Sequence, residues 1–256
     1  MTSFFCKTIN RLIAPLALEL RNRRGSDLPA LPYDLSELEI SILSKVRPFT
    51  MTSPERVAVL VEATRHLVSC GIKGDFVECG VWKGGSAMAA AMALLSCGDT
   101  RRDFWLYDTY EGMSKPTDAD VSYDGEVAEQ QLQQQDIHNP RSVWCYSPLE
   151  EVRNNLASIQ YPTQQIHFIK GKVEDTLPEQ MPERIALLRL DTDWYESTKH
   201  ELVHLYPRLI SGGVLIVDDY GYWQGSRRAV DEYFEHHAPR PLLVRIDATA
   251  RIAIKP

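Results

Sequence analysis

From Asp75 onward, short apolar runs alternate with segments of helical periodicity. This alternation constrains the fold most, because apolar strands separated by helices pair in parallel and are covered by helices on both faces. The sequence therefore predicts an α/β protein with a doubly wound sheet. Seven runs have the length and composition of strands: residues 76–79, 104–108, 166–169, 185–190, 214–217, 242–246 and 251–254.

The last two runs are separated by only four residues, 247–250. A parallel crossover needs a dozen or more residues, so these two runs form an antiparallel hairpin. We therefore expect a mostly parallel sheet of seven strands with one antiparallel strand. Two helix starts are also visible. Ser53 before Pro54 predicts a helix that ends near Val68, and the sequence from Ser147 to Glu150 has capping-box spacing with Pro148 at the first helical position.

The length of 256 residues favours one main domain. We assign it to residues 49–256, with a polar, glutamine-rich insertion at about 110–146 that is longer than a usual connection and suits a lid or acceptor site. A solvated helix with loose flanks is the alternative. Residues 1–48 are expected to form a helical extension that contacts a partner subunit or the acceptor.

Charge and cysteine content exclude several classes of protein. A net charge of -7 without clustered Lys and Arg disfavours nucleic acid as a partner. Five cysteines, an odd number with no CxxC pair, argue against a disulfide framework or a structural zinc site and favour the cytoplasm. No apolar run reaches the length of a transmembrane segment. We expect a homo-oligomer.

A glycine-rich turn follows the first predicted strand, in the segment FVECGVWKGGS. Gly80, Gly84 and Gly85 would let the backbone approach a cofactor at the strand's carboxyl end. The spacing is not G-x-G-x-x-G, which disfavours NAD. The second strand ends at Asp108, whose carboxylate suits a ribose diol. A structural turn remains possible for the glycines, and a turn or helix-capping role for Asp108.

Four aspartates gather after the fourth and fifth predicted strands, in LDTDW and IVDDY. If these strands pair in parallel, Asp191 and Asp193 lie about 5 Å from Asp218 and Asp219. Oxygen ligands without nearby His or Cys favour Mg²⁺ or a similar divalent cation. Alternatively, the acids cap helices or pair with arginines, for which the candidates are Arg184, Arg189, Arg227 and Arg228.

Five ordered blocks from about Phe49 onward resemble the macrocin O-methyltransferase family, the metal-dependent enzymes that methylate sugar hydroxyls of natural products. The blocks are ECGVWKGGS, LYDTYEGM, GKVEDTLP, RLDTDWY and GGVLIVDDY. The resemblance implies the Rossmann-like fold of the class I methyltransferases, which use S-adenosylmethionine, and a hydroxyl acceptor that is a sugar or glycosylated small molecule.

The same resemblance assigns individual residues. It implies that Asp191, Asp218 and Asp219 are the metal ligands and that Asp193 is the general base. Glu78, Gly80, Ser86 and Asp108 match the S-adenosylmethionine site, with Asp175 near the adenine. Residues before the first helix, Met51 and Thr52, are expected to hold the methionine end of the cofactor.

Three other functions compete with this interpretation. A catechol-type phenol also offers vicinal oxygens to a metal, and a methyltransferase-like fold can serve as a noncatalytic subunit. A phosphohydrolase of the haloacid dehalogenase type is disfavoured because only 26 residues separate Asp193 from Asp219, which leaves little room for its remaining elements.

Overall fold

A computed structural model describes residues 31–139 and 142–256. Seven strands form one sheet in the order β3-β2-β1-β4-β5-β7-β6, in which β7 is antiparallel to both of its neighbours. The predicted fold is confirmed. The strands are β1 (Asp75–Cys79), β2 (Phe104–Asp108), β3 (Ile166–Lys170), β4 (Ile185–Leu190), β5 (Leu209–Val217), β6 (Val244–Arg245) and β7 (Arg251–Ile254).

Two strands differ from the sequence prediction by more than one residue at one end. β5 begins five residues earlier than predicted, at Leu209, and runs through Gly212, whose φ of 79° interrupts the regular strand geometry. The Ser-Gly-Gly sequence at this point is typical of a turn, so the predicted strand begins only after it. β6 is shorter than predicted because only Val244 and Arg245 pair with β7 at this edge of the sheet.

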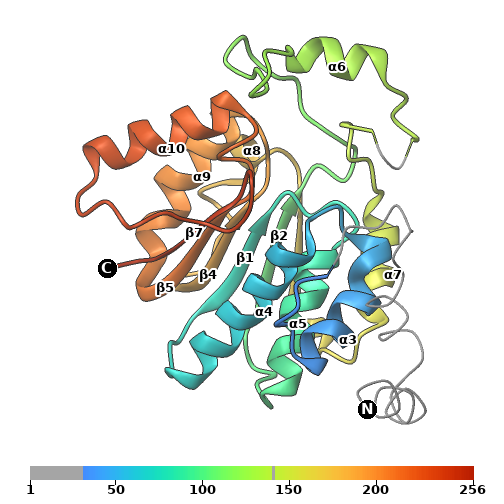
Figure 1. The fold of residues 1–256 in the computed structure, drawn as a ribbon, viewed down its shortest axis with the longest axis vertical. Coiled ribbons are helices and arrows are strands. Elements are labelled where there is room, and N and C mark those ends of the chain that lie inside the picture. The colour runs from blue at the N-terminus through green and yellow to red at the C-terminus, as the bar shows by residue number, and fades with distance from the viewer. Residues whose placement is uncertain (1–30, 140–141) are drawn as a thin grey trace, which may run out of the picture.

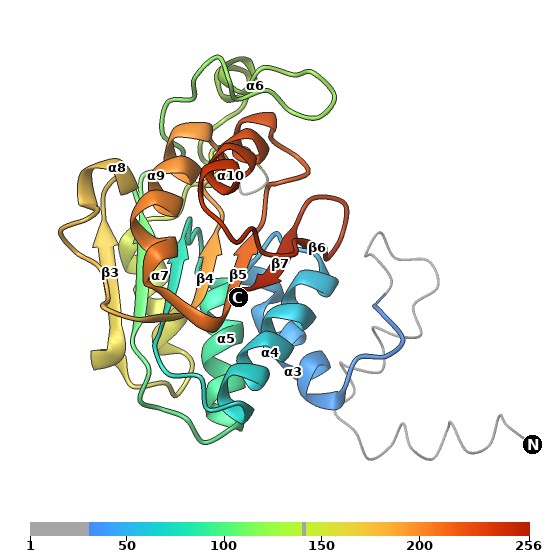
Figure 2. The ribbon, with the colours of Figure 1, turned by 90° about the vertical axis from the view of Figure 1, so that its left-hand side faces the viewer.

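Helices cover both faces of the sheet (Figures 1 and 2). One face is covered by α3 (Glu37–Val46), α4 (Pro54–Ser69), α5 (Gly85–Ser96) and α7 (Leu149–Ala157). The other is covered by α8 (Val173–Thr176), α9 (Tyr195–Leu205) and α10 (Gln224–His236). Short 3-10 helices occur at η1 (Arg47–Phe49), η2 (Thr163–Gln165) and η3 (Tyr206–Arg208).

The two predicted helix starts have different outcomes. The start at Ser53 is confirmed, since its hydroxyl accepts the Arg56 N–H at 3.2 Å. The capping box at Ser147 is wrong, because Pro148 is the N-cap of α7 and the Ser147 hydroxyl bonds the Glu151 side chain at 3.2 Å instead. The fixed φ of proline is compatible with both the N-cap and the first helical position, so the sequence does not distinguish them. The predicted start is therefore one residue too early.

The insertion between β2 and α7 lies beyond the carboxyl ends of the strands (Figures 1 and 2). It contains α6 (Ala128–Gln134) and has a small hydrophobic core of its own. Two tryptophans outside the insertion, Trp194 and Trp223, are part of this core and join the insertion to the main domain.

Part of the segment before residue 49 belongs to the main domain. Ile42, Leu43 and Val46 of α3 are buried in the same core as α4 and α5. Residues 1–30, which carry most of the predicted extension, lie outside the described residues. Among residues 31–139 and 142–256, no helix is both long and apolar enough to span a bilayer.

The turn after β1 depends on a glycine. Gly80 has a φ of 83°, and a Cβ atom there would overlap the main-chain carbonyl of Asp191. We expect Gly80→Ala to lower the free energy of unfolding by more than ~3 kcal/mol, since a positive φ alone costs about 1–2 kcal/mol and the overlap adds to it. Urea denaturation measures this change.

Gly98→Ala is the matched control, because Gly98 has a φ of 70° and nothing within 4 Å of a Cβ atom. Equal losses of unfolding free energy for the two variants would show that the overlap with the Asp191 carbonyl contributes nothing to the destabilisation.

Candidate functional site

One cavity opens at the carboxyl ends of β1, β2, β4 and β5, where residues from distant parts of the sequence meet. The main-chain N–H of Asp191 bonds the carbonyl of Cys79 at 2.8 Å, so the residues after β1 and β4 continue side by side past the sheet. Nearly all predicted site residues line the cavity: Met51, Thr52, Glu78, Gly80, Ser86, Asp108, Asp191, Asp193, Asp218 and Asp219.

Asp175 is the exception. Its side chain is exposed on α8, whereas the neighbouring Glu174 lines the cavity together with Lys172 and Val173. The structure thus brings the G-K-V-E-D block to the cavity but presents Glu174 there instead of Asp175.

Asp108 holds the glycine-rich turn in place. Its Oδ2 accepts the N–H groups of Val81 and Trp82 at 2.7 and 3.0 Å, and its Oδ1 accepts the Tyr110 N–H at 2.7 Å. Asp108 therefore has the turn role that we considered as an alternative. Because each carboxylate oxygen has two lone pairs, these three bonds leave one acceptor position, on Oδ1, which the Thr109 hydroxyl approaches at 3.5 Å.

Arg189 is the buried centre of the site's ion pairs. It is the last residue but one of β4, opposite Glu78 in the register with β1. Its guanidinium lies 2.6 Å from Glu78, 2.7 Å from Asp191 and 2.9 Å from Asp218. Only 4% of its side chain is exposed, so these three carboxylates replace water as its partners.

Arg56 of α4 connects the site to the β6–β7 hairpin. It pairs with Asp218 and donates to Asp247 at 2.7 Å and to the Thr249 hydroxyl. Burial alone would raise the pKa of Asp247, but hydrogen bonds from the Ala250 N–H, Arg56 and the Thr249 N–H outweigh it and lower that pKa. Asp218 thus forms ion pairs with two arginines, Arg56 and Arg189.

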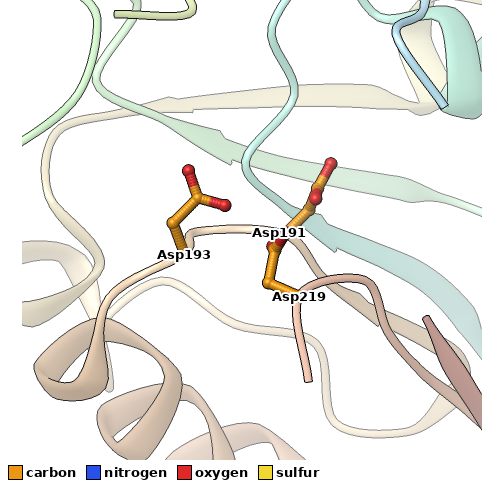
Figure 3. A group of neighbouring side chains, drawn as sticks. All are labelled: Asp191, Asp193 and Asp219. Carbon is orange, nitrogen blue, oxygen red and sulfur yellow. The ribbon is translucent and has the colours of Figure 1, made fainter. Parts of the chain in front are cut away.

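Three carboxylates form a cluster that suits a metal ion (Figure 3). Asp191, Asp193 and Asp219 each offer an oxygen, and these oxygens lie within 4.8 Å of one another. The predicted set contained Asp218 in place of Asp193. Asp218 is adjacent in sequence to Asp219 but only 2% exposed, and both arginines contact it.

The cluster is electrostatically strained without a cation. Burial raises the pKa values of Asp191 and Asp219 well above their ordinary range, and it raises the pKa of Asp193 to about 7. The buried Oδ2 atom of Asp219 has no hydrogen-bond partner in the part of the chain that the structure describes. Each observation indicates carboxylates that are unfavourable as isolated anions and that a cation or a proton would neutralise.

Sequence reasoning missed Arg56 and named Arg189 only as a possible partner of the acids. A signal for Arg189 was present. The strand IALLRL is apolar apart from this arginine, and a lone charge in a buried parallel strand requires partners. Of the other arginines in that alternative, Arg227 and Arg228 pair with Asp231 and Glu232 of their own helix.

Comparisons with known proteins agree with this geometry. Residues 45–253 match the macrocin-O-methyltransferase (TylF) family. The structure of the O-methyltransferase NovP superposes with a TM-score of 0.68 at 31% identity, covering 81% of this chain and 82% of NovP.

The relatives that are 35% identical to the chain include two with the following names and sources. One, from Streptomyces olivaceus, is 8-demethyl-8-(2,3-dimethoxy-alpha-L-rhamnosyl)-tetracenomycin-C 4'-O-methyltransferase, matched over 78% of this chain and 73% of the relative. The other, mycinamicin III 3''-O-methyltransferase from Micromonospora griseorubida, matches 77% of this chain and 75% of its own length. The chain therefore belongs to the macrocin O-methyltransferase family and is an S-adenosylmethionine-dependent O-methyltransferase.

Proposed function

We propose that the protein methylates a hydroxyl of a sugar or glycosylated natural product and that it needs a divalent cation, preferably Mg²⁺. The observation that carries this proposal is the group of carboxylates from Asp191, Asp193 and Asp219 at the edge of the cavity. Two relatives support the choice of substrate class, one whose name specifies a rhamnosyl group on its acceptor and one whose name specifies mycinamicin III.

The charge balance of the cavity favours a cation. Seven carboxylates line the cavity, those of Glu78, Asp108, Glu174, Asp191, Asp193, Asp218 and Asp219, together with three cationic side chains, those of Arg56, Lys172 and Arg189. When all are ionised, four negative charges lack a partner among these groups. One divalent ion and the positive sulfonium of S-adenosylmethionine together would offset three of the four.

Asp191 and Asp219 are common to the set predicted from the sequence and the set that the structure groups together. We infer that these two hold the ion and that Asp218, supported by Arg56 and Arg189, acts with them. Such oxygen donors suit Mg²⁺, which binds a few carboxylates and keeps exchangeable positions for water or substrate. Asp193 then remains available to accept a proton from the hydroxyl of the acceptor.

The remaining predicted residues would bind the cofactor. Gly80 removes a side chain from the floor of the cavity, and Asp108 fixes the turn beside it. The hydroxyls of Thr50 and Thr52 lie 2.9 Å apart at the cavity, next to the half-exposed Met51. Glu78 and Ser86 line the same wall, and Glu174 is better placed than Asp175 for the adenine end.

The difficult step for a sugar hydroxyl is loss of its proton. When bound, S-adenosylmethionine supplies the electrophilic methyl group and the cation makes a coordinated hydroxyl more acidic. Asp193 lies beside the metal-binding pair and would accept the proton at its carboxylate. Asp191 and Asp219 would orient the two vicinal oxygens of the acceptor for in-line attack.

A direct assay separates a glycosylated acceptor from a catechol. Incubating the protein with S-adenosylmethionine, Mg²⁺ and either mycinamicin III or catechol should add one methyl group, detected by mass spectrometry, to the macrolide glycoside only. A higher kcat/KM for catechol would instead establish a small phenol as the substrate class.

The metal proposal predicts the behaviour of Asp191→Ala. Wild-type protein should bind Mg²⁺ by calorimetry and lose turnover with a chelator, whereas Asp191→Ala should bind Mg²⁺ at least tenfold more weakly, since even outer-shell partners of metal ligands contribute roughly 10- to 100-fold. Glu179→Ala, which removes an exposed carboxylate outside the cavity, is the control. Chelator-resistant turnover by the wild type would refute the metal requirement.

The base proposal predicts a different result for Asp193→Asn. Turnover should fall by about 100- to 10,000-fold because the amide cannot accept the proton, while calorimetric affinity for S-adenosylhomocysteine stays unchanged. Unaltered turnover would remove Asp193 from the reaction.

A further inference from the structure

The loop that carries Asp193 has a strained conformation and needs support. Asp193 has a φ of 67°, in the left-handed region that non-glycine residues rarely adopt. On the core side, the Thr192 hydroxyl donates to the buried Glu201 at 2.8 Å. The Trp194 N–H bonds the Thr192 carbonyl at 2.7 Å and closes the loop. The other side of the loop faces the insertion.

Asp120 of the insertion caps the helix that follows this loop. Its side chain is fully buried, and its Oδ1 accepts the main-chain N–H of Tyr195, the first residue of α9, at 2.7 Å. The N-cap residue itself is Trp194, whose indole has no oxygen to accept that bond. Asp120 therefore provides, from 75 residues earlier in the chain, the acceptor that a helix start requires. Its negative charge also suits the helix N-terminus.

The other oxygen of Asp120 ties this cap to the insertion. Oδ2 accepts the Thr117 N–H at 2.7 Å and the Thr117 hydroxyl at 2.9 Å. The Asp120 carbonyl accepts the Ala128 N–H at 3.0 Å, at the start of α6. The carboxylate thus belongs at once to the turn of the insertion and to the start of α9.

Two tryptophans reinforce the connection. The Trp194 indole donates to the Ser114 carbonyl at 3.0 Å and packs edge-on against Trp223, with ring centroids 4.9 Å apart. A Cβ atom on Gly225 would overlap the Asp120 carboxylate, so α10 also approaches closely. The insertion is therefore attached to the starts of both helices that follow the acidic loops.

We propose that Asp120 is a positioning residue that couples the insertion to the active site by holding the loop of Asp193. The observations above place its carboxylate between the turn at Thr117 and the N-terminus of α9, where it accepts the N–H of Tyr195, two residues after Asp193. Where Asp120 contacts α9, the insertion then forms a rigid side of the catalytic site. Displacing a reacting group by about 1 Å costs on the order of 100-fold in rate, which sets the expected effect.

Hydrogen–deuterium exchange of the full chain tests the coupling without an acceptor. In Asp120→Ala, amides of residues 191–198 and of residues 114–128 should exchange at least tenfold faster, together, while those of β1 and α5 do not change. Asp118→Ala, an exposed aspartate in the same turn, should match the wild type. Faster exchange confined to 114–128 would overturn the proposal.

Turnover supplies the second readout, and this part rests on the proposed function. On an acceptor that the wild type methylates, Asp120→Ala should lower kcat by about 100-fold with unchanged affinity for S-adenosylhomocysteine. Asp120→Asn keeps an oxygen for the Tyr195 N–H but turns an NH2 group toward the Thr117 N–H, so it should recover only part of kcat. A parallel loss of kcat and cofactor affinity would indicate a general structural role and contradict positioning.

Thr117→Val covers the case in which Asp120→Ala does not fold. It removes the hydroxyl that donates to Asp120 and accepts the Ala119 N–H at 3.3 Å, but it keeps the main-chain N–H of residue 117, so residues 114–128 and 191–198 should both exchange a fewfold faster in a folded protein. Unchanged exchange at 191–198 in this variant would count against the coupling. Because exchange is independent of methyl transfer, failure of the proposed acceptor class is distinguishable from failure of this inference.

Discussion

The buried ion pairs of Arg189 are the interaction on which the site depends. One guanidinium, almost without exposure to water, contacts carboxylates at three strand ends: Glu78 near the end of β1, Asp191 after β4 and Asp218 after β5. Removing Arg189 would leave Glu78 buried without its ion-pair partner, which is costly in a low-dielectric interior. This arrangement keeps the strand ends in register and allows several acids to lie at one edge of the sheet.

The arginines neutralise only part of that acidic edge. Arg56 and Arg189 both contact Asp218, whereas Asp191 and Asp219 retain raised pKa values because of their burial. Asp218 is thus paired with two arginines, Asp191 is paired with Arg189 and also lines the cavity, and Asp219 lines the cavity without an ion pair to a described residue. A site of this kind favours the binding of a cation and of a cationic cofactor, because either one reduces the repulsion among the carboxylates of the folded chain.

Backbone strain concentrates around the same cavity. Of the four non-glycine residues with positive φ in the described ranges, Trp82, Cys145 and Asp193 line the cavity, and the N–H of the fourth, Tyr110, binds Asp108. Such conformations persist only where the surroundings hold them. Here hydrogen bonds to three carboxylates hold the strained segments. Asp108 binds the glycine turn, Glu201 binds the Asp193 loop from the core side, and Asp120 binds the start of α9 from the insertion side.

The sequence by itself determined the sheet, its single antiparallel strand and the meeting of Asp191, Asp193, Asp218 and Asp219, because strand periodicity and connection lengths are local properties. Only the tertiary structure decided how these acids are partnered. Arg56 and Asp120 lie 162 and 75 residues from the groups they bind, and no periodicity links such positions. It also placed Glu174 at the cavity and Asp175 outside it, since the orientation of a four-residue helix depends on packing against its neighbours.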